Sequence, residues 1–387
     1  MDKKSTFKNQ DILTRVACTF VFTLFTFFYL YYYQADLLTV MQHVFSKGQT
    51  HYNHFVGAVL ITLVLLLVQA ATVHLLKKVR MAWALTFVPS ALCLILLTDV
   101  KPDELSGTLA FGTWVYLFPA ALALFVLIIW GAEKAGLSLI LSRRVHSTQI
   151  CSLWINLLIV FVTVTMVCIS GNSDKVYHAR IHMEQCIMNG DYDGALKTSQ
   201  QLDKSDENIT MLTAYALSRN KELPESIFEY RLKGGSAALM PNGTCIKFEL
   251  LPDSAFYSYM GNMYLQRMST MKYLDYQKRH NRINSRTADY LLCGYLLDKN
   301  LNSFVNEITK YYAVNDSAAL PKHYKEALLL YTHMHSNPRI IYSNNIMNAD
   351  FQDFQKLERS TADIPERQTA LRDTYGNTYW YYYQYGK

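Results

Sequence analysis

Five long apolar stretches lie within residues 12–169 of the chain, and none lies in residues 172–387. The stretches cover residues 12–33, 55–76, 81–97, 111–130 and 150–169. A helix needs roughly 20 mostly apolar residues to cross the hydrocarbon core of a bilayer. The pattern therefore predicts an all-α chain, with a five-helix transmembrane bundle in residues 1–171 and a soluble domain in residues 172–387.

The third stretch, 81–97, is the shortest, and Pro89 lies near its middle. A proline leaves backbone groups unpaired in a helix, but neighbouring helices in a membrane can satisfy them. We therefore expect this stretch to cross the bilayer. The alternative is a re-entrant segment, which enters and leaves the membrane on the same side.

The positions of Lys and Arg predict the orientation of the bundle. Residues 1–171 hold 12 of them, and all but Lys47 and Lys101 lie in the N-terminal tail, through Arg15, or in the turns after the second and fourth stretches. Because cytoplasmic loops carry the excess of Lys and Arg, we expect the N-terminus in the cytoplasm. An odd number of crossings then leaves the C-terminal domain on the outer side.

The net charge of +6 follows mainly from this asymmetry. Residues 1–171 carry 12 Lys and Arg against 7 Asp and Glu, whereas residues 172–387 carry 25 against 24. A nucleic-acid binder needs a basic face on a soluble domain. The nearly neutral C-terminal domain therefore predicts no nucleic-acid partner.

Residues 172–387 show the apolar spacing of helices, with Pro, Gly, Asn or Asp between them. We expect helices over residues 178–202, with a break at Asn189-Gly190-Asp191, and over 206–219, 225–232, 255–281, 285–298, 303–312, 321–335 and 344–357. The one long non-helical stretch is 233–254, in which residues 244–251 are a candidate short strand.

A short pattern recurs along this domain. It runs from Asn189 to Leu196, with Gly190, Tyr192 and Ala195 inside it, and again from Asn348 to Phe354, with Asp350 and Phe351 inside it; a looser copy starts at Asn300. The pattern resembles the turn between the paired helices of the tetratricopeptide repeat. It predicts that each copy connects two helices.

A second spacing places a glycine four residues after a tyrosine. It occurs as Tyr257, Gly261 and Tyr264, and again as Tyr290 and Gly294. In the tetratricopeptide repeat a similar spacing lies on the first helix, where the small residue lets two helix axes approach. The copies are irregularly spaced, so we expect a divergent TPR-like solenoid of stacked helix pairs. The alternative is an irregular all-helical domain.

The end of the chain is rich in aromatic residues, with seven among residues 375–385. We expect a terminal helix or strand that packs on the last repeat. The alternative is a tail that lies on the membrane face, because Tyr and Trp favour the membrane–water interface.

Three segments, Tyr31–Leu38, Lys47–Tyr52 and Thr378–Tyr383, carry a resemblance to a known group of proteins. The chain resembles an uncharacterised family of inner-membrane proteins of the Bacteroidetes. The resemblance implies an inner-membrane location with the C-terminal domain in the periplasm, and it assigns no activity. Members of this bacterial group O-glycosylate exported proteins at Asp-Ser/Thr-apolar triplets, and Ser254 and Ser317 stand in such triplets.

The loop from residue 34 to residue 54 is the main candidate for chemistry near the membrane. It holds Asp36, His43, His51 and His54, and an acid with imidazoles can bind a metal or exchange protons. Membrane glycosyltransferases that use polyprenol-linked sugars often place an acid in this loop. No third ligand follows His51 and His54 at a recognised spacing, so the alternative is an amphipathic helix over residues 37–45 in the membrane interface.

No other pattern predicts a metal, a cofactor or a catalytic residue. His178 and His182 share a helix face, but the HExxH motif of zinc proteases is absent. Cys186, Cys245 and Cys293 are widely spaced and form no CxxC motif, which leaves open whether a disulfide joins two of them.

Lys278, Arg279, Arg282 and Arg286 form a short basic cluster. We expect a solvated helix end here. The alternative is a contact with anionic headgroups or with a partner.

Three hypotheses for function follow. The first is a scaffold without catalytic activity or cofactor, whose bundle lies in the bilayer and whose helical domain binds a protein or peptide partner in the envelope. The second is a membrane enzyme that acts on a lipid-linked substrate at the outer face through Asp36 and His51 or His54. The third is an accessory subunit of an envelope transport complex, which docks through its bundle.

Overall fold

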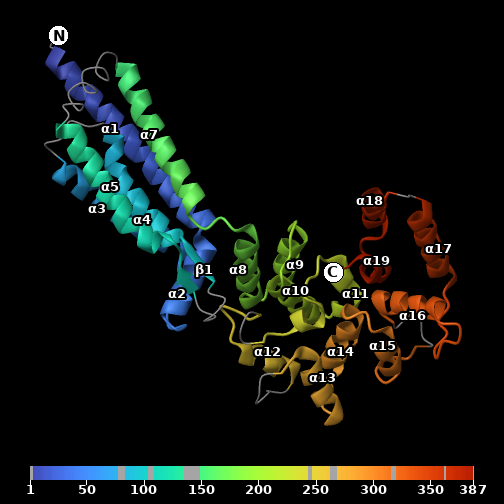
Figure 1. The fold of residues 1–387 in the computed structure, drawn as a ribbon. Helices are drawn as coiled ribbons and strands as arrows, with labels where there is room; N and C mark the ends of the chain where they lie inside the picture. Colours follow the sequence, from blue (N-terminus) through green and yellow to red (C-terminus); the bar gives the residue numbers. More distant parts are fainter. Residues whose placement is uncertain are drawn as a thin grey trace. The chain divides into compact units, whose positions relative to one another are not determined.

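The computed structural model describes residues 3–76, 83–102, 109–134, 149–242, 246–261, 268–314, 320–360 and 363–386. The chain divides into two compact units, Met1–Asp174 and Lys175–Lys387, called here the N-terminal unit and the C-terminal unit. Both are built almost entirely from helices (Figure 1), which confirms the predicted all-α class. The sequence analysis predicted the boundary between the two units at residue 171.

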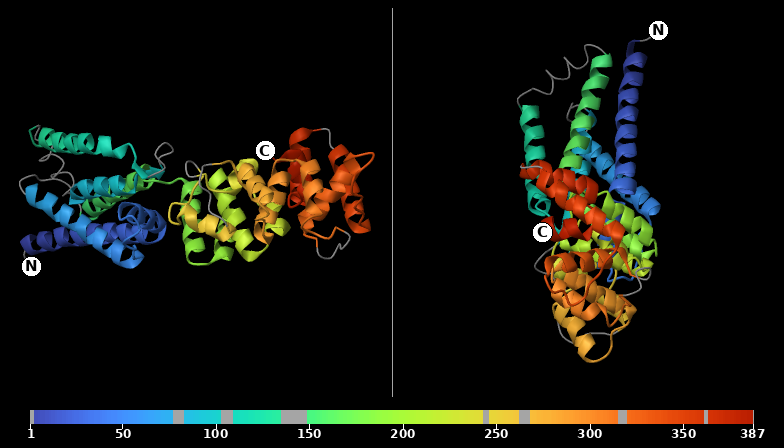
Figure 2. Two further views of the ribbon diagram at one scale, coloured as in Figure 1. Left: turned by 90° about the horizontal axis from the view of Figure 1, so that it is seen from below. Right: turned by 90° about the vertical axis from the view of Figure 1, so that its right-hand side faces the viewer.

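Among the described residues of the N-terminal unit, four helices are long and apolar enough to cross a membrane. They are α1 (Lys3–Phe28) with its π-helical continuation η1 (Tyr29–Tyr33), α3 (His54–Leu75), α5 (Trp114–Lys134) and α7 (Gln149–Ser170). Helices α1 and α7 lie side by side (Figure 2). Large apolar side chains such as Leu67 and Ile169 are exposed, as expected of helices whose solvent is lipid.

The third apolar stretch forms a shorter helical segment. It begins with a 3₁₀ turn, η2 (Trp83–Phe87), and continues as α4 (Val88–Thr98). Pro89 stands in the first turn of α4 rather than in mid-helix. A first-turn residue has no intrahelical acceptor for its N–H, so the proline breaks no hydrogen bond there.

Polar side chains hold this short segment along α7. The backbone N–H of Ala84 donates to Asn156 Oδ1 at 2.9 Å, and the N–H of Asn172 donates to the carbonyl of Thr98 at 3.0 Å. The segment therefore runs in the same direction as α7, alongside residues 156–172. Towards α3, Gln69 Nε2 donates to Thr86 Oγ1 at 3.0 Å, and Ser90 Oγ donates to the Leu65 carbonyl at 2.7 Å.

Short elements connect the apolar helices at one end of the unit. α2 (Ala35–Phe45) follows η1, as the amphipathic pattern of residues 37–45 predicted. An antiparallel hairpin that the sequence did not predict, β1 (Val100–Pro102) and β2 (Leu109–Phe111), pairs Val100 with Phe111. Asp99 Oδ2 accepts a hydrogen bond from the N–H of Trp114, which ties the end of α4 to the start of α5.

The C-terminal unit is a succession of helices that follow one another along its length (Figure 2). They are α8 (Lys175–Met188), α9 (Tyr192–Gln200), α10 (Glu207–Asn220), α11 (Leu223–Ser226), η3 (Ile227–Glu229), η4 (Gly235–Leu239), α12 (Asp253–Met260), α13 (Thr270–Arg279), α14 (Ser285–Leu297), α15 (Leu301–Ile308), α16 (Lys322–Met334), α17 (Asn345–Ser360), α18 (Ile364–Tyr375) and α19 (Tyr379–Tyr385). Most of the helices predicted from apolar spacing are therefore present.

Two of the predicted repeat turns have the same construction. Gly190 (φ 76°) ends α8 in the left-handed region, and Lys299 (φ 56°) ends α14 in the same way. The next residue then caps the following helix: Asp191 accepts from the N–H of Gly194, and Asn300 accepts from the N–H of Ser303. Side-chain oxygens at this position satisfy a backbone donor of the first helical turn. Both copies thus connect two helices, as predicted.

Four predictions for this unit are wrong. The copy at 348–354 is no turn, because it lies inside α17. The helix expected over 255–281 is interrupted, because Gly261 (φ 94°) ends α12. The helix expected over 225–232 is reduced to α11 and one 3₁₀ turn. Residues 246–251 form no strand.

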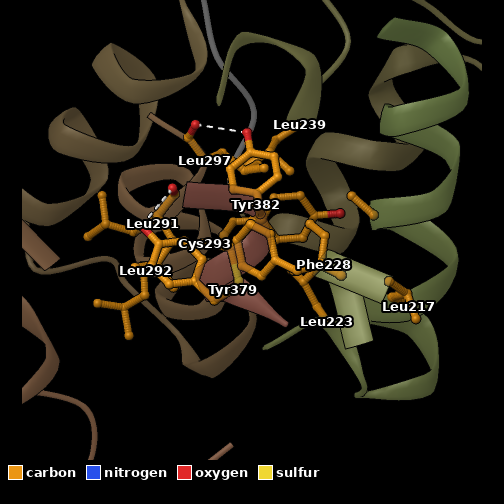
Figure 3. Packing of buried hydrophobic residues seen from close by; sticks show 14 of the residues in the cluster. Leu217, Leu223, Phe228, Leu239, Leu291, Leu292, Cys293, Leu297, Tyr379 and Tyr382 are labelled. Atoms are coloured by element: carbon orange, nitrogen blue, oxygen red, sulfur yellow. Dashed lines mark hydrogen bonds between the residues drawn. The ribbon is translucent and has the colours of Figure 1, made fainter. Parts of the chain in front are cut away.

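The aromatic tail forms α19, which lies in the core of the unit (Figure 3). Tyr379 and Trp380 are buried, and the hydroxyls of Tyr379 and Tyr382 donate to the last carbonyls of α14, at 3.2 and 3.0 Å. Phe228 of η3 packs on both tyrosine rings, with centroids 4.9 and 4.8 Å away. Docking of the tail is confirmed, and its placement on a membrane face is wrong for these buried rings.

A buried carboxylate fastens α19 to α16. Glu326 Oε2 accepts from the N–H of Tyr379 at 2.7 Å and lies 2.8 Å from Nδ1 of His323, which is also buried. The indole N–H of Trp380 donates to the Glu326 carbonyl at 2.9 Å. Helix α19 therefore begins on a charged group that water does not reach.

We predict that Tyr379→Ala loosens the C-terminal unit. Removing a large buried aromatic side chain costs about 3–5 kcal/mol, and the Leu296 carbonyl loses one of its donors, keeping the Lys299 N–H. Hydrogen–deuterium exchange of the full chain in detergent micelles should show faster exchange in α14 and α16. Tyr276→Ala, at a side chain that is 42% exposed, is the matched control and should leave exchange unchanged. Equal effects of the two changes would contradict the core position of α19.

Candidate functional site

The acid and the imidazoles of the 34–54 loop are spread over two helices and the link between them. Asp36 lies half-buried in the first turn of α2, and His51 is exposed before α3. His54 is the first residue of α3, and its Nε2 lies 3.1 Å from Thr39 Oγ1. Within the described ranges, no three His, Cys, Asp or Glu side chains are grouped as metal ligands would be. The catalytic role of Asp36, His51 and His54 therefore stays a hypothesis, because these side chains are not grouped into a catalytic or metal site.

A polar junction next to this loop joins the ends of three apolar helices. Gln34 is fully buried after η1, and its Nε2 donates to Tyr29 Oη at 2.9 Å and to the Asn172 carbonyl at 3.1 Å. Asn172 Nδ2 donates in turn to the carbonyl of Val100. A buried amide is stable only when hydrogen bonds replace its water. The junction therefore fixes the ends of α1, α4 and α7 relative to one another.

The residues predicted to pack the repeats have different roles. A Cβ at Gly294 of α14 would lie 2.7 Å from Met271 Sδ, so this glycine does allow close approach of α13. Gly261 is a helix end instead, because its left-handed backbone favours glycine. Tyr290 is buried in the core, and the Tyr257 hydroxyl donates to the Pro241 carbonyl at 2.8 Å. Tyr264 lies outside the described residues.

The other five residues of this prediction come from the recurring pattern, and Gly190 ends α8 as described above. Tyr192 begins α9, and Ala195 is fully buried one turn later, as the pattern requires. In the wrongly assigned copy, Asp350 is exposed, whereas Phe351 is buried against Trp380 with ring centroids 5.1 Å apart. Phe351 thus packs on the tail rather than between paired helices.

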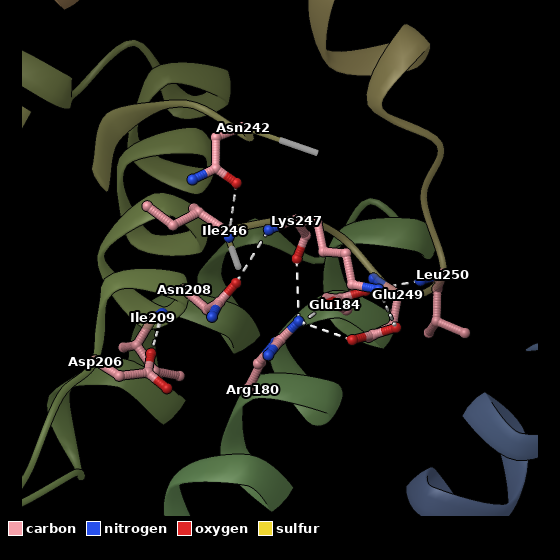
Figure 4. A network of polar contacts seen from close by, with 10 residues as sticks. All are labelled: Arg180, Glu184, Asp206, Asn208, Ile209, Asn242, Ile246, Lys247, Glu249 and Leu250. Atoms are coloured by element: carbon pink, nitrogen blue, oxygen red, sulfur yellow. Dashed lines mark hydrogen bonds and ion pairs between the residues drawn. The ribbon is translucent and has the colours of Figure 1, made fainter. Parts of the chain in front are cut away.

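A buried ionic network that the sequence did not reveal lies between α8 and the extended segment after residue 245 (Figure 4). Arg180 Nη2 donates to Glu249 Oε1 at 3.0 Å and to the Lys247 carbonyl at 3.2 Å. Glu184 Oε2 accepts from the N–H groups of Glu249 and Leu250, at 2.7 and 2.8 Å. The network gives this irregular segment hydrogen bonds that regular secondary structure would otherwise provide.

Burial changes the acidity of Glu184. Desolvation raises the pKa of this carboxyl to about 7, and Arg180 and the two backbone N–H groups only partly oppose the rise. A carboxyl with such a pKa can exchange a proton near neutral pH. Here, however, its oxygens contact the chain's own backbone, so the geometry indicates a structural role.

The sequence held one signal for this network. Arg180 and Glu184 stand four residues apart on a predicted helix, a spacing at which opposite charges pair. Such pairs are ordinarily exposed, and nothing in the local pattern shows that Glu249 covers this one. The third member comes from 65 residues further along, in the stretch expected to be irregular.

We predict that Glu184→Gln removes a pH dependence of stability. Because the folded-state pKa is raised from 4.5 to about 7, the contribution of Glu184 is full below pH 4.5 and is lost as pH rises through 7. Hydrogen exchange of α8 in the full chain measures the free energy of opening of this helix at pH 5 and pH 8. Between these two pH values, that free energy should fall by up to about 3 kcal/mol more in the wild type than in the variant. If the free energies of opening of the two proteins differed by the same amount at both pH values, the raised pKa of Glu184 would be contradicted.

The remaining sequence candidates do not come together. No disulfide joins Cys186 and Cys293 in the structure, and Cys245 lies outside the described residues. Ser254 is exposed at the start of α12, where a modifying enzyme could reach it. Ser317 also lies outside the described residues.

The predicted basic cluster is only partly free. Lys278 lies 3.4 Å from both Asp275 Oδ1 and Glu307 Oε1, so its charge is balanced within the unit. Arg279 and Arg282 are exposed. Arg286 turns to an aromatic ring instead, with its Cζ 4.6 Å from the ring centroid of Tyr259.

Comparison with known proteins gives one match. The model of a family of unknown function, DUF6057, matches residues 105–281 and 265–386. No curated protein and no solved structure matches the chain. The match fits the expectation of an uncharacterised family. The predicted bacterial group, the repeat identity and the membrane topology stay predictions.

Proposed function

We propose that this chain, which belongs to the DUF6057 family of unknown function, is a membrane-anchored binding protein whose C-terminal unit presents a divergent TPR-like surface to a protein or peptide. The observation that carries the proposal is the division into an apolar unit and a second unit with a core of its own. In that second unit, the buried carboxylates of Glu184 and Glu326 accept backbone N–H groups. Carboxylates used in this way serve folding, and the exposed surface is left for function.

The equivalent turns support a repeat-like construction. The segments around Gly190 and Lys299 each place a left-handed residue before an Asp or Asn cap. Such turns set the angle between consecutive helices, and stacked helix pairs form extended surfaces that hold peptides or partner segments.

We further propose five membrane crossings, with the N-terminus in the cytoplasm and the C-terminal unit in the periplasm of an inner membrane. The hydrogen bonds of Ala84 and Asn172 support a crossing by residues 83–98, because they place the start of this segment beside Asn156, seven residues into α7, and its end beside Asn172, just after α7. The charge asymmetry supports the orientation. Arg15 lies over the Trp83 ring, 4.5 Å from its centroid, so a basic side chain marks the expected cytoplasmic end.

Alkaline phosphatase fusions test this topology, since the enzyme is active only outside the cytoplasm. With five crossings, a fusion after Lys134 is inactive and a fusion at Lys387 is active. With four crossings, residues 83–98 stay on one side, and both results are reversed. The two arrangements thus give opposite outcomes at both positions, and only the first agrees with the proposal.

Site-specific photo-crosslinking tests the binding function. We predict that benzoylphenylalanine at Tyr276 or Ile346, both exposed in the C-terminal unit, gives discrete crosslinked products in intact cells. The same residue at Leu67, an exposed apolar position of α3, should give none of these products. Absence of protein adducts from every exposed position of the C-terminal unit would contradict a binding role.

A further inference from the structure

Two arginines from different helices meet at one tyrosine ring of the C-terminal unit. Arg219 Cζ, from the last turn of α10, lies 5.0 Å from the ring centroid of Tyr259 in α12. Arg286 Cζ, from the first turn of α14, lies 4.6 Å from the same centroid. Arg219 also lies 5.0 Å from the ring centroid of Tyr192. Both arginines are exposed, and Tyr259 is half-buried.

Neighbouring groups hold these side chains in place. Arg219 Nη1 donates to Tyr215 Oη at 3.1 Å, and Arg286 Nη1 donates to the Tyr259 carbonyl at 3.2 Å. The Tyr259 hydroxyl donates to the Ser218 carbonyl at 2.9 Å, which fixes the ring. A guanidinium has five N–H donors, and each of these two arginine hydrogen bonds uses only one of them. Most donors of both groups therefore stay free in a preset orientation.

Neither guanidinium has an acidic partner among the residues that the structure describes. Other cations of the unit do have one: Arg180 pairs with Glu249, and Lys322 pairs with Glu229. Two positive charges on one ring repel each other, and the N-terminal end of α14 adds a positive potential beside Arg286. A ligand with negative charge would remove this repulsion.

We propose that Arg219, Tyr259 and Arg286 form a recognition site for an acidic peptide segment, one carboxylate to each guanidinium. The planar fork of an arginine matches a carboxylate in a bidentate manner, and stacking on tyrosine leaves that fork free. The two Cζ atoms flank a single ring, so the site suits two nearby carboxylates. This inference rests on the proposed binding function and names the chemistry of its partner.

A lipid surface fits this site less well. Attraction to anionic headgroups requires clusters of several unpaired Lys or Arg. In the C-terminal unit, Lys278 is already balanced by Asp275 and Glu307, and residues 172–387 carry 25 basic against 24 acidic side chains. The site is a small, ordered arrangement of arginine and tyrosine rather than a broad basic face.

The test uses the full chain in nanodiscs of uncharged lipid. Fluorescence anisotropy measures binding of a labelled peptide with four glutamates separated by glycine and serine, against the same peptide with four glutamines. The test variant is R219Q/R286Q. The matched control is R359Q, which removes an exposed arginine of α17. Y259L removes the shared ring.

We expect the wild-type chain and R359Q to bind the glutamate peptide and not the glutamine peptide. R219Q/R286Q should bind it about 100-fold more weakly, since each guanidinium contributes charge-assisted hydrogen bonds. Y259L should lose about tenfold, because both forks lose their orientation. Glutarate should compete with the peptide more strongly than glycerol 3-phosphate at equal ionic strength.

Three outcomes would overturn the site. One is equal binding by R219Q/R286Q and R359Q, and another is no preference for glutamate over glutamine. The third is stronger competition by glycerol 3-phosphate, which would indicate a phosphate headgroup. Crosslinks from Tyr276 or Ile346 that persist in R219Q/R286Q would leave the binding function intact and reject only this partner chemistry.

Discussion

The hydrogen bonds between the 83–98 segment and α7 are the contacts on which the packing of the N-terminal unit and the proposed topology depend. Asn156 lies seven residues into α7 and Asn172 follows its last residue by two, and each bonds to backbone at one end of the short segment. The number of crossings decides on which side of a membrane the C-terminal unit lies. Two asparagines thus link the packing of the N-terminal unit to the compartment in which the C-terminal unit would work.

Buried carboxylates have the corresponding role in the C-terminal unit. Glu184 holds the extended segment at residues 249 and 250, and Glu326 holds the start of α19. Both segments are remote in sequence from the helix that binds them. A buried charge is costly unless hydrogen bonds compensate for the lost water, so these contacts tolerate few other arrangements of the two segments. Arg219 and Arg286, by contrast, contact tyrosines of the unit and have no acidic partner among the described residues.

Local patterns predicted most helices, because apolar spacing and helix caps are read from neighbouring residues. The turns at Gly190 and Lys299 were found from the residues that build them. The pattern failed at 348–354, since the same residue types also fit a helix interior when Phe351 and Phe354 can be buried under the tail. It failed at Gly261 because spacing alone does not distinguish a packing glycine from a helix end.

The sequence by itself determined the all-α class, the apolar helices and the charge asymmetry, because hydrophobic length and the Lys and Arg positions are properties of the linear chain. Tertiary structure alone decided that Glu249 reaches Arg180, that Tyr379 fills the core and that Arg219 meets Arg286 at one ring. Each of these contacts joins helices or segments distant in the chain. Such contacts depend on how the helices pack, and local spacing carries no information about which distant residues will meet.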